Sequence, residues 1–104
     1  MYRAQLLVFP ALLSFAAEPA RAAGLACGWY AITACKPTID EAVEYARRTG
    51  SGTVINTSSP AYPNFQNGFF CVVSGPLDRN TALSTAGYWR STGVSPNAYA
   101  KSAC

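Results

Sequence analysis

The chain has 104 residues and a formal net charge of +3, which fit one small domain. Its basic residues are scattered apart from Arg47 and Arg48, so the sequence has no basic stripe for nucleic acid. It contains no histidine, which excludes Ser-His and Cys-His nucleophiles and removes a common ligand of zinc.

The N-terminus has the features of a secretory signal peptide. Arg3 precedes an apolar stretch over residues 4–17, which is too short to span a bilayer but has the length of a signal core. A small-x-small motif that signal peptidase can cleave ends at Ala22. We therefore predict that residues 1–22 are a signal peptide, and that residues 23–104 are exported to the periplasm or secreted.

Four cysteines follow the predicted cleavage site: Cys27, Cys35, Cys71 and Cys104. An even number in an exported chain predicts two disulfides. Zinc binding is the competing use, but no Cys-x-x-Cys pair is present, so we expect no metal and no cofactor. Lipidation of Cys27 is a further alternative, which is disfavoured because Leu25 stands one position away from its place in a lipoprotein signal.

The first half of the mature domain predicts a strand, a helix and a strand. Residues 27–35 are rich in aromatic and β-branched side chains, which favours a strand. Thr38 and Glu41 match a capping box, and apolar residues then recur at helical spacing over residues 39–49. The predicted buried stripe of this helix is Ile39, Ala42, Val43 and Ala46. A short strand is expected at residues 52–58.

The second half repeats this order. Residues 59–68 are dense in Pro, Asn and Gly and predict a loop, which an apolar strand follows at residues 69–74. After a turn at Gly75-Pro76, Asp78 can cap a second helix, and residues 97–104 predict an edge strand. The buried stripe expected on that helix is Ala82, Leu83 and Ala86.

The order of elements predicts an α+β fold, βαββαβ. Two similar halves of this kind build the split βαβ or ferredoxin-like arrangement, a four-stranded antiparallel sheet with two helices on one face. The other face of the sheet is then left open to water or to a ligand.

The carboxylates of the mature domain do not indicate catalysis. Three of the four lie at or near predicted helix starts, where carboxylates act as caps: Asp40, Glu41 and Asp78. Glu44 stands at helical spacing from Arg47 and Arg48 and predicts an exposed ion pair. Residues 74–80, SGPLDRN, match neither a phosphate loop nor a nucleophile elbow. We expect a protein that is not an enzyme, and a Ser-Lys pair is the catalytic alternative left open.

The chain from about Gly28 to Ala103 resembles the SPOR (sporulation-related repeat) domains, which bind septal peptidoglycan in bacteria. The resemblance is carried by the strand GWYAIT, the capped helix TIDEAVEYARRTG and the stretch FFCVVSGPLDRNTALSTAGYWRSTGVSPNAYAKS. It implies a SPOR-like domain over residues 23–104 that binds peptidoglycan glycan strands without catalysis, in the cell envelope and in connection with cell division. The first strand departs from the family pattern. SPOR domains typically carry a polar residue, often Gln, followed by Gly-Ser-Phe in this strand, whereas residues 31–35 of this chain are AITAC.

The resemblance also implies how the strands are arranged. The first and third strands lie side by side and parallel at the centre of the sheet, and the last strand is antiparallel to the first. The side chains directed toward the helices are Tyr30, Ile32, Phe70, Val72 and Ser74. Those directed to the open face are Trp29, Ala31, Thr33, Cys35, Phe69, Cys71 and Val73. Of the three connectivities that four cysteines allow, the implied disulfides are Cys27–Cys104 and Cys35–Cys71.

The expected ligand surface is the open sheet face together with the loop over residues 59–68. Aromatic rings there can stack on sugars while Asn and Thr side chains form hydrogen bonds. The candidate residues are Trp29, Thr33, Tyr62, Asn64, Phe65 and Phe69. In one alternative, Trp29 and Phe69 only cover the Cys35–Cys71 bridge. In another, the same face binds a periplasmic protein and has no glycan affinity. We expect the mature domain to be a monomer without nucleic-acid or membrane partners.

Overall fold

The predicted order of elements is confirmed by a computed structural model, which describes residues 26–104. The predicted signal peptide lies outside these residues. The elements are β1 (Trp29–Lys36), α2 (Ile39–Thr49), β2 (Thr53–Asn56), β3 (Phe70–Leu77), α3 (Arg79–Ser91) and β4 (Tyr99–Ser102). They form an α+β fold with two helices and a four-stranded antiparallel sheet, as expected.

The strands lie in the order β2-β3-β1-β4, and each neighbouring pair is antiparallel. The parallel direction implied for β1 and β3 is wrong, because Trp29 pairs with Leu77 at one end of the two strands. At the other end Cys35 pairs with Cys71. The physical reason is that α2 returns the chain so that β2 runs in the same direction as β1. The chain then reverses in the loop of residues 57–69, and β3 fits between them as the antiparallel partner of both.

Both helices begin at side-chain caps that the sequence predicts. The Oγ1 atom of Thr38 accepts a hydrogen bond from the N–H of Glu41 at 3.3 Å. The Oδ1 atom of Asp78 accepts one from the N–H of Thr81 at 2.9 Å. The first helix has its predicted bounds and ends at Gly50, whose φ of 63° is left-handed. Local capping signals therefore set the start of both helices.

The strand β3 continues through Gly75 and Pro76 to Leu77, so the turn expected at this dipeptide is wrong. A Cβ atom on Gly75 would lie 2.6 Å from the ring of Tyr30. Glycine is required here because the Tyr30 side chain lies against the backbone of β3. The dipeptide thus makes room for a core side chain inside the strand, and the helix cap at Asp78 follows directly.

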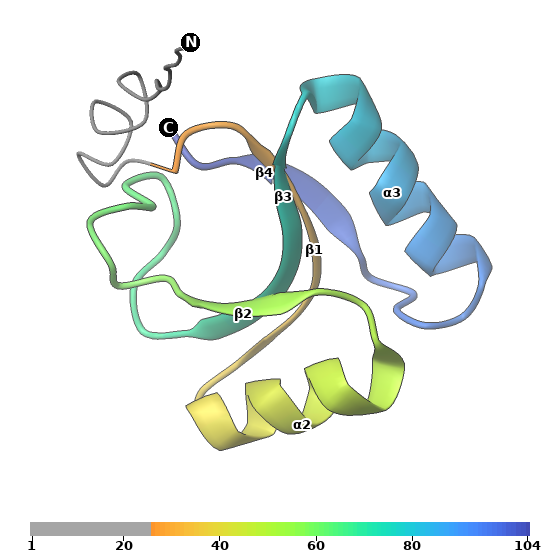
Figure 1. Ribbon diagram of the computed structural model, residues 1–104, viewed down its shortest axis with the longest axis horizontal. Helices are drawn as coiled ribbons and strands as arrows, with labels where there is room; N and C mark the ends of the chain where they lie inside the picture. The colour runs from red at the N-terminus through yellow and green to blue at the C-terminus, as the bar shows by residue number, and fades with distance from the viewer. Residues whose placement is uncertain (1–25) are drawn as a thin grey trace, which may run out of the picture.

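Figure 1 shows that the sheet is curved, with both helices outside the curve. The loop of residues 57–69 lies on the inside of the curve, where it joins β2 to β3. The side of the sheet that the two helices cover is the helix side, and the side on which the loop of residues 57–69 lies is the loop side. The two helices therefore lie on one side, as expected, but the expectation of an open opposite face is wrong because this loop covers part of it.

The larger core side chains lie on the loop side. They form a buried cluster of Tyr30, Ile32, Ile55, Phe65, Cys71, Val73 and Ala103. The orientation implied for Cys71 and Val73 is therefore confirmed, whereas the orientation implied for Tyr30 and Ile32 is wrong. The helix side is packed instead by small side chains, namely Ala31, Ala86 and Ala98, with Trp89 against them. Alanines bring a helix close to a sheet, and such close packing leaves little space for a tyrosine or an isoleucine beneath it.

An irregularity in β1 explains why Cys35 still lies on the loop side. The register of β1 against β3 shifts between Ile32 and Ala34, which is a bulge at Thr33. Strict alternation from Ile32 would direct Cys35 toward the helices. The extra residue directs the side chain of Cys35 to the loop side, which is the side that the resemblance implied. Cys35 then lies opposite Cys71.

The apolar stripes predicted for the helices are only partly buried. Ala42 on α2, and Ala82 and Ala86 on α3, are almost fully buried. Three larger members of the predicted stripes, Ile39, Val43 and Leu83, are exposed. Both helices therefore bury their small residues, while the larger side chains of the predicted stripes are left about half exposed.

Candidate binding pocket

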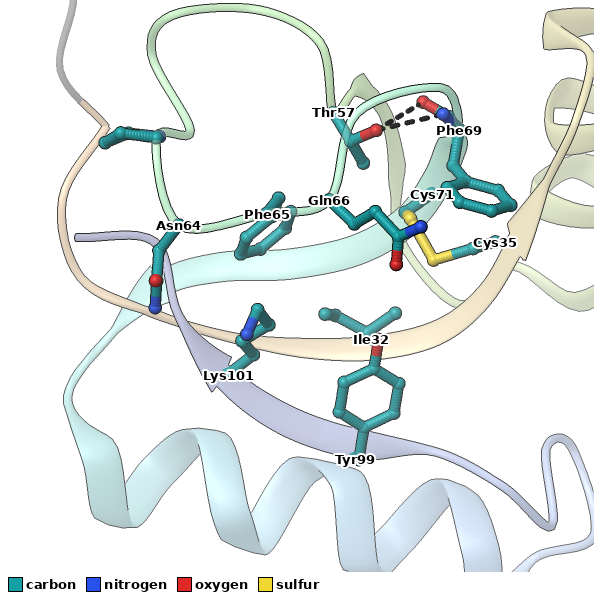
Figure 2. A pocket seen from close by; sticks show the side chains of 11 residues that line it. Ile32, Cys35, Thr57, Asn64, Phe65, Gln66, Phe69, Cys71, Tyr99 and Lys101 are labelled. Atoms are coloured by element: carbon teal, nitrogen blue, oxygen red, sulfur yellow. Dashed lines mark hydrogen bonds between the residues drawn. A yellow bond between two sulfur atoms is a disulfide. The ribbon is translucent and has the colours of Figure 1, made fainter.

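A pocket of about 590 Å³ lies between the sheet and the loop of residues 57–69 (Figure 2). The central strands contribute Ile32, Cys35 and Cys71. The edge strand β4 contributes Tyr99 and Lys101. The loop contributes Thr57, Pro63, Asn64, Phe65, Gln66 and Phe69. Volumes of this size are typical of sites for small ligands, so the loop side carries a candidate binding site.

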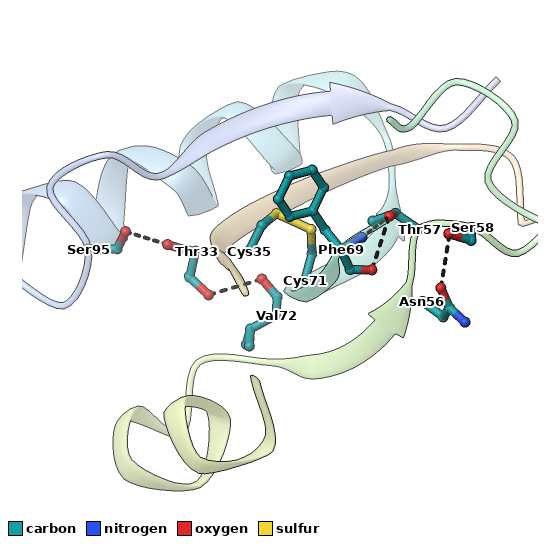
Figure 3. Close-up of a disulfide and its surroundings, with 9 residues drawn as sticks. All are labelled: Thr33, Cys35, Asn56, Thr57, Ser58, Phe69, Cys71, Val72 and Ser95. Atoms are coloured by element: carbon teal, nitrogen blue, oxygen red, sulfur yellow. Dashed lines mark hydrogen bonds between the residues drawn. A yellow bond between two sulfur atoms is a disulfide. The ribbon is translucent and has the colours of Figure 1, made fainter. Parts of the chain in front are cut away.

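Hydrogen bonds close the base of the loop. The backbone N–H of Thr57 donates to the carbonyl oxygen of Phe69 at 3.0 Å. The Thr57 hydroxyl donates to the same carbonyl oxygen and accepts from the Phe69 N–H, both at 3.0 Å (Figure 3). The N–H of Gly68 donates to the Ser58 hydroxyl at 2.9 Å. The two ends of the loop are therefore joined where it leaves the sheet.

The far part of the loop is bonded to the two ends of the described chain. The backbone N–H of Asn64 donates to the carbonyl oxygen of Ala103, and the Asn64 side-chain amide donates to that of Ser102, each at 3.0 Å. The N–H of Ala26 donates to the carbonyl oxygen of Ala61 at 3.2 Å. Bonds at both ends fix the loop over the sheet, and the pocket is thereby preformed.

The loop packs on the sheet through a cluster of three aromatic rings. The ring of Tyr30 meets the rings of Tyr62 and Phe65 edge to face, with centroids 5.8 and 5.9 Å away. Tyr62 and Phe65 stack on each other at 5.7 Å. The Tyr30 hydroxyl donates to the carbonyl oxygen of Ala26 at 2.8 Å, and burial raises the pKa of Tyr30 to about 12. Phe65 is thus held in place as a wall of the pocket.

The structure brings three of the six candidate residues, Asn64, Phe65 and Phe69, to the pocket. Tyr62 supports Phe65 from the core. Thr33 is buried elsewhere, because its hydroxyl donates to the carbonyl oxygen of Val72 at 3.0 Å on the helix side (Figure 3). The orientation implied for Thr33, toward the open face, is therefore wrong, because Ile32 faces the loop side and the next side chain along the strand faces the opposite side.

Trp29 also lies away from the pocket. The guanidinium of Arg79, at the start of α3, lies over the Trp29 ring at 5.5 Å from its centroid. This places Trp29 next to a helix rather than beside the Cys35–Cys71 bridge. Phe69, in contrast, lies next to that bridge and lines the pocket (Figure 3). One ring of the expected aromatic pair is thus available to a ligand on the loop side.

Sequence reasoning missed Gln66 and the two residues of β4 that line the pocket, Tyr99 and Lys101. The two β4 residues are separated by two positions, which directs their side chains to the same side of a strand. That spacing was a usable signal, because the edge strand itself was expected. Partial burial raises the pKa of the Tyr99 hydroxyl above its ordinary value of 10.0, and this hydroxyl would be protonated at neutral pH even without that shift.

Both disulfide pairings that the resemblance implied are present. Cys35 and Cys71 form the floor of the pocket, with their Cα atoms 4.0 Å apart on adjacent strands. Cys27 and Cys104 join the segment before β1 to the segment after β4, with Cα atoms 5.3 Å apart. One bridge therefore joins the two central strands near one end, and the other joins the two ends of the domain.

Residues 26–104 contain neither a cluster of metal-ligating side chains nor a membrane-spanning helix. No group of three or more acidic, cysteine or histidine side chains in this range has the arrangement of a metal site. Within the same range, neither helix has the length and apolar character needed to cross a membrane. The pocket on the loop side is the feature of this range from which a binding function is inferred below.

Comparisons with known proteins find no match for this chain among the models of protein families, the curated proteins or the solved structures. Its function is therefore inferred from the pocket itself. The pocket combines aromatic surface, side-chain amides and a single cationic group, that of Lys101. Such a set of groups can bind a polar ring compound by stacking, hydrogen bonding and charge.

Proposed function

We propose that the mature domain is an exported, SPOR-like module that binds peptidoglycan glycan strands without catalysis in the pocket between sheet and loop. The order of elements, the strand order β2-β3-β1-β4 and the position of both helices on one side agree with what the resemblance implies. Two disulfides favour export, because such bonds persist in oxidising compartments. This domain has no need of a cofactor for binding alone.

The observation that carries this proposal is the pairing of aromatic rings with amides in one pocket. Phe65 and Phe69 present ring surface, against which the apolar face of a sugar ring can pack. The amides of Asn64 and Gln66 lie on the same loop and can bond hydroxyl and acetamido groups. Gln66 is exposed, and Figure 2 shows its side chain extending over the bridge between Cys35 and Cys71.

The proposed site is narrower than the surface expected from the sequence. Trp29 and Thr33 lie outside it, while Gln66, Tyr99 and Lys101 are added. A strand of glycan would lie along β4 and under the loop, because these elements border the pocket. The rigid attachment of the loop favours binding, since little ordering of the protein is then needed.

Co-sedimentation with purified peptidoglycan sacculi tests this function. We expect the oxidised mature domain to sediment, and we expect Phe69→Ala and Gln66→Ala each to reduce its affinity about tenfold, the loss of roughly one good contact. Trp29→Ala is the matched control, because it removes a large ring outside the pocket and should leave sedimentation unchanged. Circular dichroism verifies that each variant is folded.

Two results would contradict the proposed function. One is a failure of the oxidised wild-type domain to sediment, which would instead favour the alternative, a module that binds a periplasmic protein. The other is equal loss of binding in Trp29→Ala and in both pocket variants, which would place the binding surface elsewhere. Gln66 makes the second result decisive, because its exposed side chain has no evident part in folding.

A further inference from the structure

The strand β2 forms one edge of the sheet, and part of its outer backbone is unpaired. The N–H of Thr57 donates to the carbonyl oxygen of Phe69, so the backbone groups of Thr57 are directed toward β3. Because this direction alternates along a strand, the backbone groups of Val54 and Asn56 are directed away from β3. The carbonyl oxygen of Asn56 accepts from the N–H of Ser59, but no other segment of residues 26–104 bonds the backbone of Val54. The edge of β2 can therefore pair with a further strand.

The two edges of the sheet differ in their protection against such pairing. On the β4 edge, Lys101 carries a charge, and the side-chain amide of Asn64 in the loop donates to the carbonyl oxygen of Ser102 at 3.0 Å. Lysines and covering loops both protect an edge strand from pairing with another chain. The strand β2, with the sequence TVIN, contains neither a charged residue nor a proline. Of the two edges, β2 is thus the less protected.

An apolar flank of α2 borders the β2 edge. Of the two helices, only α2 contacts β2. The Tyr45 hydroxyl donates to the carbonyl oxygen of Val94, in the segment after α3, at 3.1 Å, so the Tyr45 flank of α2 faces α3. Val43 lies about 200° from Tyr45 around the helix, which directs it to the opposite flank, beside the outer edge of β2. Ile39 lies one turn before Val43 on that flank, and the two side chains are 51% and 49% exposed.

Val54 extends this apolar surface onto the strand. The neighbouring Ile55 belongs to the core on the loop side, so the side chain of Val54 is directed to the helix side, where α2 lies. Ile39, Val43 and Val54 together form the edge patch. The patch and the unpaired backbone beside it can be covered by the same partner, which would bury apolar surface and complete the backbone hydrogen bonds.

The charges on α2 indicate which partner fits the edge patch. The first turn of the helix is acidic at Asp40, and its last turn is basic at Arg47. Both residues lie within about 60° of Val43 around the helix. Arg47 bonds Glu44 of its own helix through Nη2 alone, which leaves its other nitrogens to a further acceptor. An antiparallel copy of α2 would place Asp40 beside Arg47 at both ends of the patch, so this surface is complementary to itself.

We propose that two copies of this domain associate through β2, about a two-fold axis perpendicular to the sheet. The two β2 strands are antiparallel, and the Val54 residues of the two copies exchange a pair of backbone hydrogen bonds. Val43 and Ile39 of one copy pack against those of the other, and Asp40 of each copy pairs with Arg47 of its partner. The four strands of each copy then form one continuous sheet, in place of the monomer expected from the sequence. Both pockets lie on the loop side of this sheet, away from the paired helices.

Sedimentation equilibrium of the oxidised mature domain, measured over a range of concentrations, tests this association. We expect the mass to rise from that of one copy toward that of two. Val43→Lys should weaken the dimer by about tenfold or more, because it places two cations in the apolar contact. Leu83→Lys is the matched control, because Leu83 is 42% exposed on α3, which does not contact β2. It should associate as the wild type does, and circular dichroism verifies that both variants are folded.

A mixing experiment tests the antiparallel arrangement of the helices. Asp40→Lys alone places like charges at both ends of its own dimer, and so does Arg47→Glu alone, so each variant should associate about tenfold more weakly than the wild type. An equal mixture of the two variants restores opposite charges at both ends. We therefore expect the mixture to associate more strongly than either variant by itself.

Several results would overturn this inference. The mass of a single copy at every concentration would exclude the dimer and leave the β2 edge to an extended segment of another protein. Equal weakening by Val43→Lys and Leu83→Lys would place the interface elsewhere. A mixture no stronger than its components would contradict the antiparallel helices. None of these measurements involves a sugar, so the dimer and the proposed function can fail independently.

Discussion

The two sides of the sheet are packed in different ways. The helix side is filled by alanines and by hydroxyl groups, of which Thr33, Ser51 and Ser95 are buried. The loop side is filled by aromatic and branched side chains, and the pocket lies among them. In the pattern that the sequence indicated, the helices would cover the large core and the opposite side would be left for a ligand.

This difference in packing shows that the loop side of the sheet contributes both to stability and to the candidate site. On the helix side, close packing and side-chain hydrogen bonds join helices to strands, as where the Thr33 hydroxyl meets that of Ser51 at 3.2 Å. On the loop side, Phe65 is at once a core residue and a wall of the pocket. Substitutions on the loop side should therefore change stability and binding together, whereas those on the helix side should change stability alone.

The largest expected effect is the loss of the bridge that closes the domain. Cys27→Ser combined with Cys104→Ser opens a loop with a sequence separation of 77. The chain-entropy model gives a loss of about 4 kcal/mol in the free energy of unfolding, measured by guanidinium denaturation. An unchanged midpoint would show that the backbone bonds between the loop and the C-terminal segment hold the ends without the bridge.

A smaller loss is expected from a change inside the loop-side core. Phe65→Ala should lower the free energy of unfolding by about 3 kcal/mol, because it leaves a cavity beneath the loop. It should also weaken binding to sacculi, since the same ring lines the pocket. Thermal and denaturant unfolding, followed by sedimentation below the new midpoint, measure the two effects.

The helix side offers the matched control for that prediction. The Ser95 hydroxyl donates to the carbonyl oxygen of Thr33, and both groups are buried. Ser95→Ala should cost about 1 kcal/mol of stability, the value of one lost hydrogen bond, and leave binding unchanged. If Ser95→Ala weakened binding as much as Phe65→Ala, the proposed division of roles between the two sides would be wrong.

The smallest effect concerns the pH dependence of the cap on α3. Hydrogen bonds from Thr81 hold the pKa of Asp78 below its ordinary value of 3.8. A lowered folded pKa means that the cap stabilises the fold above the unfolded pKa, and that this contribution is lost as the pH falls through the folded value. The melting temperature of the wild type should therefore fall between about pH 5 and about pH 2 by slightly more than that of Asp78→Asn, whose amide caps without titrating. Parallel melting curves for the two proteins would contradict this role.

Several local features could be predicted from the sequence because their causes are local. Thr38 and Asp78 start helices by bonding backbone N–H groups three residues away, and Gly50 ends one by adopting a left-handed conformation. The order of elements followed from these signals. The sequence also identified Asn64, Phe65 and Phe69 for the candidate site, because a loop with aromatic and amide groups is visible as a composition.

The rest depended on contacts between distant segments. The sequence predicts a turn at Gly75, but the small size of this residue is needed because the ring of Tyr30 lies against it. Lys101 was not singled out, because an edge strand shows which side chains share a side but not what they face. The bulge at Thr33 lies in a run without glycine, so no local signal marks the place where alternation fails.

By itself, the sequence determined the order of strands and helices, the residues at which both helices begin and how many cysteines could pair. Only the tertiary structure decided which side of β1 faces the helices. Both sides of this strand are apolar, with Tyr30 and Ile32 on one and Ala31 on the other. Alternation therefore predicts two buried sides, but it does not show which of them packs against the helices. The choice was made by size, because alanine-lined helices pack close to Ala31, while the larger side chains find space beneath the loop that forms the pocket.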